Sequence, residues 1–134
     1  MKLTAILNVQ GIILVALGII MLTPISVALV MGEYGSILPF VAASFISILL
    51  GLVSQLRGGF CRDFDNLKRT EGMLIVTLSW LVTGAIGGIP YLFYGLGPID
   101  AYFESISGFT TTGATILKDF APYPKTFFFW RSLS

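Results

Sequence analysis

The sequence predicts an all-α membrane protein with three transmembrane helices, one short re-entrant helix followed by a loop, and the start of a fourth helix. The chain of 134 residues is 55% hydrophobic and only 11% charged, whereas soluble domains average about 25% charged residues. Three long runs contain no charged residue, and an uncharged, hydroxyl-rich stretch follows the third run. That stretch is too polar for a lipid-facing helix and too apolar for an ordinary surface loop.

The uncharged runs extend from Leu3 to Gly32, from Tyr34 to Leu56 and from Gly72 to Ile99. Each exceeds the roughly 20 residues that cross a bilayer core. A signal peptide is the alternative for the first run, but its apolar core exceeds the usual ~7–15 residues and no clear cleavage site follows. We therefore expect an uncleaved spanning helix. Pro24 is expected to kink or end the first helix, and Pro90 the third.

Small residues recur at a spacing of four in two of the runs. Ala43, Ser47 and Gly51 form one stripe, and Gly84 and Gly88 form another. Small residues on one face let two helices approach closely, so both stripes predict helix packing. Aromatic residues near the end of the third run are expected to form an interfacial belt: Tyr91, Phe93 and Tyr94.

Cysteine and histidine content narrows the possible chemistry. The chain has one cysteine, Cys61, and no histidine. An internal disulfide is therefore excluded, and zinc, haem and Cys/His catalysis have little support. Cys61 lies in a polar loop, where it is expected to be a bystander rather than a reactive thiol.

The loops predict an orientation. Residues 57–71 contain four basic side chains, whereas the loop between the first two runs contains only Glu33. The positive-inside rule places the N-terminus, with Lys2, and the 57–71 loop in the cytoplasm. The third helix then ends outside, and the hydroxyl-rich stretch re-enters from there. The basic loop also suits lipid headgroups, with a cytosolic regulator as a weaker alternative.

A short helix is expected between Asp100 and Ser107. Gly97-Pro98 interrupts the preceding helix, and Asp100 can cap the next one. Eight residues extend about 12 Å at 1.5 Å per residue, which is less than half of a core of ~30 Å. The C-terminal carbonyls of this helix would end near the midplane, where the negative end of the helix dipole favours a cation.

The loop that follows reads Thr110-Thr111-Thr112-Gly113-Ala114-Thr115. An extended backbone turns successive carbonyls to opposite sides, and glycine can adopt the dihedral angles that bring them to one side. The three threonines suit an extended chain, and their hydroxyls can bond the backbone. The loop is thus predicted to be an ion filter lined by carbonyl oxygens. A Thr/Gly turn outside the membrane is the alternative.

The sequence leaves more than one role possible for the charged residues near the loop. Glu104 either lies buried behind the filter, paired with a donor from another repeat, or bonds local backbone; a direct role toward the ion is the alternative. Asp100 could also attract cations electrostatically. Lys118 and Asp119 are expected in a solvated loop. Arg131 is expected to reach an acidic partner beyond this chain.

The loop and its flanks resemble the Trk/Ktr/HKT potassium-uptake family, and are especially similar to bacterial membrane subunits of the TrkH/TrkG type. The resemblance covers essentially the whole chain. It rests on Thr70-Glu71-Gly72, Thr77-Leu78-Ser79-Trp80, Gly88-Ile89-Pro90-Tyr91, the stretch from Asp100 to Thr115, and Trp130-Arg131-Ser132-Leu133.

The resemblance implies potassium uptake across the bacterial inner membrane, with K⁺ as the transported ion. The implied potassium ligands are backbone oxygens of Thr111, Thr112 and Gly113, with Thr110 and Ala114 as further candidates. Residues that would support the filter are Glu104, Asp100 and Thr115. Implied partners are membrane lipid, the remaining pore repeats of a longer subunit, a second copy in a homodimer, and a cytosolic nucleotide-binding regulator of the TrkA type. Neither nucleic-acid binding nor enzyme activity is implied.

In that family four helix–pore-loop–helix repeats surround one ion path. Residues 1–68 would form a preceding two-helix unit, and residues 69–134 the first repeat, cut short in its second helix, which begins near Tyr123. We therefore expect a fragment of a longer subunit, because one loop cannot surround an ion and four short copies would leave the pore unlined. A non-conducting membrane scaffold is the alternative. A membrane enzyme is disfavoured, since only Asp100 and Glu104 approach an ionisable cluster.

The loop differs from the potassium-channel filter Thr-Val-Gly-Tyr-Gly in having only one glycine. Selectivity for potassium over sodium is thus expected to depend heavily on Gly113, and its replacement by serine should raise sodium uptake.

Overall fold

The computed structural model describes residues 3–59, 65–115, 118 and 123–134, and every regular element in this part of the chain is a helix. The elements in order are α1 (Leu3–Ile20), α2 (Thr23–Met31), the 3₁₀ turn η1 (Tyr34–Ser36), α3 (Ile37–Gly58), α4 (Arg69–Phe93), α5 (Pro98–Phe109) and α6 (Lys125–Leu133). Three stretches are long and apolar enough to cross a membrane: Leu3–Met31, Tyr34–Gly58 and Arg69–Phe93. The predicted all-helical class with three membrane-capable helices is confirmed.

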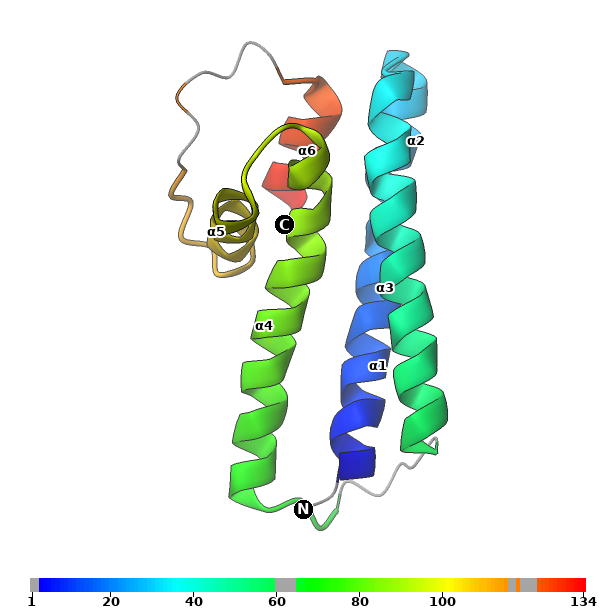
Figure 1. Ribbon diagram of the computed structural model, residues 1–134, viewed down its shortest axis with the longest axis vertical. Helices are drawn as coiled ribbons and strands as arrows, with labels where there is room; N and C mark the ends of the chain where they lie inside the picture. Colours follow the sequence, from blue (N-terminus) through cyan, green and yellow to red (C-terminus); the bar gives the residue numbers. More distant parts are fainter. Residues whose placement is uncertain (1–2, 60–64, 116–117, 119–122) are drawn as a thin grey trace.

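The long helices run side by side along the long axis of the molecule (Figure 1). The first residues of α1, the end of α3 and the start of α4 lie at one end, and η1 and the end of α4 lie at the other. In the same view α5 lies beside the upper half of α4 and is seen almost end-on, so it crosses the long helices rather than running parallel to them.

Proline interrupts the first span as predicted. α1 ends at Ile20, and α2 begins at Thr23 with Pro24 in its first turn. Proline suits that position because the first N–H groups of a helix have no intrahelical partner. Pro90 behaves differently, since it lies inside α4, which continues to Phe93.

The predicted stripe on α3 packs against α1. The hydroxyls of Ser44, Ser47 and Ser54 donate to the carbonyls of Gly18, Leu14 and Leu7 at 2.8, 2.6 and 2.6 Å. A Cβ atom added at Gly51 would lie 2.8 Å from the carbonyl oxygen of Gly11. The two backbones are therefore close enough for side-chain hydroxyls on one helix to bond carbonyls on the other.

The second stripe receives α5. A Cβ atom added at Gly88 would lie 3.1 Å from the carbonyl oxygen of Ala101, and one added at Gly84 would overlap the side chain of Ile106. Gly87, which the spacing of four did not include, also lies against α5, facing Phe109 and Ser105. Three glycines on α4 thus let α5 lie directly on its backbone.

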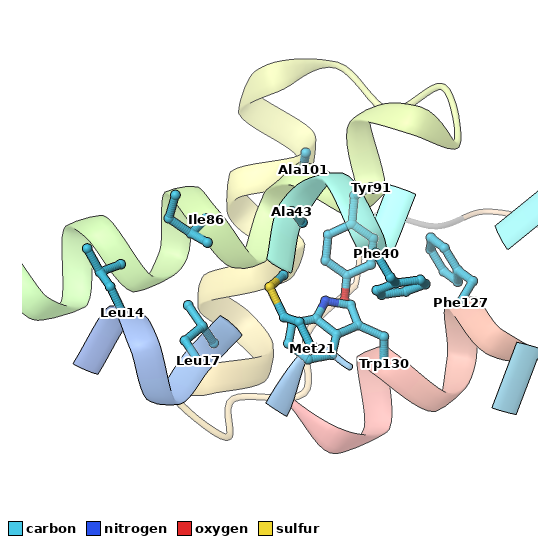
Figure 2. Packing of buried hydrophobic residues seen from close by; sticks show 10 residues of the cluster. All are labelled: Leu14, Leu17, Met21, Phe40, Ala43, Ile86, Tyr91, Ala101, Phe127 and Trp130. Atoms are coloured by element: carbon cyan, nitrogen blue, oxygen red, sulfur yellow. The ribbon is translucent and has the colours of Figure 1, made fainter. Parts of the chain in front are cut away.

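One core joins the N-terminal helices to α4, α5 and α6 (Figure 2). Its aromatic members include Tyr91, whose ring meets that of Phe127 edge-on at 5.2 Å, and Phe40, which meets Trp130 at 6.0 Å. Tyr91 is completely buried, so its predicted place in an interfacial belt is wrong; Phe93 is 52% exposed. The predicted division of the chain after residue 68 stays a prediction.

Candidate functional site

The helix that leads into the predicted filter begins earlier than expected. Gly97 is its N-cap residue and Pro98 lies in its first turn, so Asp100 belongs to the first turn and is not the cap. The prediction for Asp100 as a cap is therefore wrong, because Pro98 is favoured at the first helical position. Asp100 still lies where a helix N-terminus favours a carboxylate.

The same helix continues past Ser107 to Phe109, and the loop folds back on its end. The N–H groups of Thr110, Thr111 and Thr112 donate to the carbonyls of Ile106, Gly108 and Ser107 at 2.9, 3.0 and 3.0 Å. A helix leaves its last carbonyls without intrahelical donors, and here the loop supplies them. These three carbonyls therefore accept hydrogen bonds from the loop. The C-terminal end of α5 is thus less open toward an ion than the sequence predicted.

Two residues in the loop have positive φ angles, Thr111 at 55° and Gly113 at 72°. The unusual dihedral expected at Gly113 is present. The extended conformation expected for the threonines is wrong for Thr110 and Thr111, which form a turn at the end of α5. The bonds from the loop to the α5 carbonyls hold this turn, although a left-handed residue with a side chain costs roughly 1–2 kcal/mol.

Hydroxyl groups brace the loop, as the sequence predicted. Thr110 Oγ1 donates to the Ile106 carbonyl at 2.7 Å and lies 2.8 Å from Thr112 Oγ1. Ser107 Oγ donates to the Ala114 carbonyl at 2.6 Å. The carbonyl of Ala114 therefore already accepts one hydrogen bond from within the chain.

Glu104 connects the loop to α6. Its side chain is fully buried, and Oε2 forms an ion pair with Arg131 Nε at 3.0 Å. The other oxygen, Oε1, accepts a hydrogen bond from Thr115 Oγ1 at 2.7 Å. The expectations that Glu104 pairs with another repeat and that Arg131 finds its partner beyond this chain are both wrong, since the two pair with each other. They are separated by 27 residues, so no local pattern could have indicated the pair.

A cavity of about 310 Å³ lies between the loop and the end of α6. Its lining comprises Ser107, Gly108, Thr111, Gly113, Arg131, Ser132, Leu133 and Ser134. Residues 110–115 are exposed in the chain. Among the residues that the structure describes, no group of three His, Cys, Asp or Glu side chains could hold a metal ion, so backbone and hydroxyl oxygens are the donors available at this site.

A second carboxylate that contacts α6 was not indicated by the sequence. Glu33, in the connection between the first two spans, accepts hydrogen bonds at the N-terminus of α6. The donors are the N–H groups of Lys125 and Thr126, at 2.9 and 3.0 Å, and Thr126 Oγ1 at 2.6 Å. Burial raises the pKa of Glu33, but the hydrogen bonds from Thr126 and Lys125 and the charge of Lys125 outweigh it, so the pKa lies below its ordinary value.

Some predictions concern residues outside the described part of the chain. These are the environment of Cys61, the basic charge of Arg62 and Lys2, and the solvated position of Asp119. Lys118 is exposed, as expected.

Comparison with known proteins gives one consistent result. No family model matches the chain. The Trk system potassium uptake protein TrkH of Vibrio parahaemolyticus is 34% identical over 134 residues, which cover 98% of this chain and 27% of that protein. TrkH of Escherichia coli is 35% identical over 136 residues, covering 99% of this chain and 28% of the relative. An uncharacterized cation transporter of Methanocaldococcus jannaschii is 32% identical over 133 residues, covering 95% and 26%.

The structural comparison agrees with the sequence comparison. The crystal structure of the potassium transporter TrkH from Vibrio parahaemolyticus matches with a TM-score of 0.86 at 34% identity, covering 98% of this chain and 28% of that one. The chain thus spans about a quarter of the length of the relatives it matches. Over nearly its whole length, this chain is similar in sequence and in structure to part of the TrkH-type potassium uptake proteins.

Proposed function

We propose that this chain supplies the first pore-loop unit of a Trk-type potassium uptake subunit. In this proposal K⁺ is held by the backbone oxygens of Thr111, Thr112 and Gly113, with Thr110 and Ala114 beside them. The observation that carries the proposal is the pair of left-handed residues, Thr111 and Gly113, in a loop without charged side chains.

Left-handed residues matter here because they change where carbonyls point. In an extended chain successive carbonyls alternate in direction. Positive φ at Thr111 and Gly113, which are two positions apart, breaks that alternation and can turn neighbouring carbonyls to one side. A dehydrated potassium ion needs such a set of oxygens in place of its water shell.

The position of the loop suits this role. In Figure 1 the loop after α5 turns near mid-height of the long helices, away from the end at which α2 meets η1. Non-helical backbone at membrane depth is tolerated where it is buried in protein or lines a water-filled path. Residues 110–115 are exposed in this chain, which leaves room for other loops to complete a ring of oxygens.

The ion pair between Glu104 and Arg131 would hold the end of the loop at Thr115. Glu104 bonds Thr115 on one side and Arg131 on the other. A buried carboxylate that bonds both groups fixes their relative positions, and removal of its cationic partner would be costly. We therefore propose Glu104 and Thr115 as supports of the filter. Arg131 is a third proposed support, because it forms an ion pair with Glu104. Asp100, exposed at the N-terminal end of α5, is proposed to raise the local concentration of cations.

The remainder of the assembly is inferred from the family resemblance. Residues 1–68 would form a two-helix unit in front of the first repeat, which begins at residue 69. Three further repeats, a second copy of the subunit and a TrkA-type nucleotide-binding regulator would complete the system. Lipid would contact the exposed apolar faces of α3 and α4, which include Phe45, Leu56 and Val76.

The proposed location is the bacterial inner membrane, with the N-terminus in the cytoplasm. The N-terminal end of α1 and the connection before α4 lie at the same end of the molecule, and that connection contains Lys68 and Arg69. Reporter fusions can test this orientation. A periplasm-active phosphatase should be active when fused after Glu33 and inactive when fused after Asp65; the reverse pattern would contradict the proposed orientation.

The function can be tested in a hybrid subunit, in which this chain replaces the matching residues of Vibrio parahaemolyticus TrkH. The hybrid should restore growth at low potassium to cells that lack potassium uptake. Gly113→Ser should lower the ratio of K⁺ to Na⁺ uptake, because serine is strained at a φ of 72°. Gly72→Ser is the matched control, since Gly72 also has open space around it but lies in a regular helix.

An unchanged uptake ratio in the Gly113→Ser hybrid would reject the filter assignment. The scaffold alternative predicts that alanine at Thr110, Thr111 and Thr112 leaves the hybrid unaffected. The small-residue stripes, which would have been the interaction surface of a scaffold, are already covered by α1 and α5 within this chain.

A further inference from the structure

We propose that Glu33 is a positioning residue for the filter loop, through which the two N-terminal spans brace α6 and the ion pair behind the filter. This inference rests on the proposed function of the loop. Glu33 lies outside the loop, in the connection between α2 and α3. Its partner Lys125 follows 92 residues later in the sequence.

The first step of the argument is the contact itself. Glu33 uses both carboxylate oxygens at the start of α6, where Oε1 accepts from the Lys125 N–H and Oε2 accepts from the N–H and hydroxyl of Thr126. Pro124, the N-cap residue of α6, offers no side-chain acceptor. A residue from another part of the chain therefore does what a local cap residue usually does.

The second step is the short distance along α6 from this contact to the filter support. Thr126 and Phe127 are completely buried, and Trp130 is 1% exposed. Trp130 donates through Nε1 to the Gly87 carbonyl at 3.2 Å and packs against Phe40 of α3 and Phe109 of α5. The next residue, Arg131, forms the ion pair with Glu104.

The third step joins these contacts into one path. Glu33 fixes the first turn of α6, α6 carries Arg131 to Glu104, and Glu104 holds Thr115 at the end of the loop. Because α6 has only nine residues, a shift at its first turn should also move its last turn. Loss of the Glu33 contact should therefore loosen the loop as well as the beginning of α6.

Glu33 could act only as a cap of α6, or it could also connect the N-terminal spans to the filter loop. These two roles make different predictions, and a second substitution distinguishes them. Glu33→Gln removes the charge and turns an amide nitrogen toward the α6 donors. Pro124→Asp, added to Glu33→Gln, supplies a cap from the adjacent residue but no link to the N-terminal spans. Asp65→Asn is the matched control, because it removes an exposed carboxylate in the connection between α3 and α4.

Hydrogen exchange of the purified hybrid subunit in detergent is the direct measurement. Glu33→Gln should reduce protection of the peptide covering 125–131 by roughly tenfold, as expected for loss of hydrogen bonds to a charged group. It should also raise exchange at Thr112, whose N–H donates to Ser107. Pro124→Asp should restore protection at 125–131 but not at Thr112. Asp65→Asn should change neither.

Ion uptake is the second measurement. The ratio of K⁺ to Na⁺ uptake should fall in Glu33→Gln and remain low in the double variant. If Pro124→Asp restores both the uptake ratio and the Thr112 protection, Glu33 is only a helix cap and the proposal is wrong. Unchanged exchange at Thr112 in Glu33→Gln would also contradict the proposal. If Gly113→Ser leaves the uptake ratio unchanged, the filter assignment fails, and the exchange at Thr112 alone decides whether the brace exists.

Discussion

At the scale of single residues, the loop depends on backbone angles more than on side-chain identity. Gly113 has a φ of 72° and nothing within 4 Å of an added Cβ. Space therefore does not require glycine at this position, but the backbone angle favours it. Thr111 adopts a similar angle of 55° with a side chain, and its N–H donates to the Gly108 carbonyl.

Gly113→Ala should accordingly destabilise the protein although alanine has room. A left-handed residue with a Cβ costs roughly 1–2 kcal/mol. Gly72→Ala is the matched change in helix α4, also with open space, and should stabilise by up to about 1 kcal/mol because alanine is the better helix former. Thermal unfolding in detergent measures both. Equal effects of the two substitutions would show that the angle at Gly113 imposes no strain.

The ion pair between Arg131 and Glu104 gives a second prediction at this scale. Arg131→Met should cost about 3–5 kcal/mol, because it leaves the buried Glu104 carboxylate without its cation. Glu104→Gln in the same protein should recover much of that loss, since no buried charge then remains. A double-mutant cycle on unfolding free energies measures the coupling. Strictly additive effects would contradict the pair.

At the scale of helices, close contact is determined by small residues that face each other. The α1–α3 contact combines glycine on both helices with serine hydroxyls that bond carbonyls across the interface. The α4–α5 contact places three glycines under one short helix. Packing and interhelical hydrogen bonds are what hold helices together in a bilayer, because lipid is as apolar as their side chains.

Gly51→Leu should therefore separate α1 from α3. Its side chain would meet Val15 and the carbonyl oxygen of Gly11, 2.8 Å from the added Cβ, and a backbone atom cannot move aside as a side chain can. Overpacking of this kind costs typically about 1–3 kcal/mol. Cross-linking of cysteines placed at Leu7 and Ser54, which face each other across the interface, should be lost in Gly51→Leu and kept in Gly72→Leu.

At the scale of the whole molecule, one core and one carboxylate connect the N-terminal spans to the rest. Leu14, Met21 and Phe40 share the core with Phe127 and Trp130. Glu33 adds a polar connection at the end of the molecule where α6 begins. The described part of the chain therefore holds together as one packed body rather than as separate helical hairpins.

The Glu33 contact predicts a pH dependence of stability. Its pKa is lowered from 4.5 in the folded protein, so the stabilisation is fully present above that value and is lost as the pH falls through the lowered pKa. Among the described residues, Lys125 and Tyr94 are the other ionisable groups facing Glu33, and burial raises the pKa of Tyr94 further from the acidic range. Glu33→Gln should be about 1–3 kcal/mol less stable than the native chain at pH 7.

The difference between Glu33→Gln and the native chain should stay constant from neutral pH to about pH 5 and shrink only in more acidic solution. Thermal unfolding of both proteins across this range measures it. A difference that is independent of pH down to strongly acidic solution would show that the charge of Glu33 does not contribute.

Much of the fold could be predicted from local patterns. The three spans follow from uncharged runs, the break before α2 from Pro24, and the helix contacts from glycine and serine at a spacing of four. These properties depend on residues close together in the chain. The loop after α5 and the special backbone angle at Gly113 were also predictable, because a lone glycine among threonines stands out locally.

By itself, then, the amino-acid order determined the number of membrane-capable helices, their small-residue faces and the loop that carries the proposed filter. Only the tertiary structure decided that Glu104 pairs with Arg131, that Glu33 caps α6, that Tyr91 is buried and that Thr111 is left-handed. Each of these depends on groups that packing brings together, or on hydrogen bonds that packing allows. Such partners leave no periodic trace in the chain, because a carboxylate can be satisfied by any donor that the fold delivers.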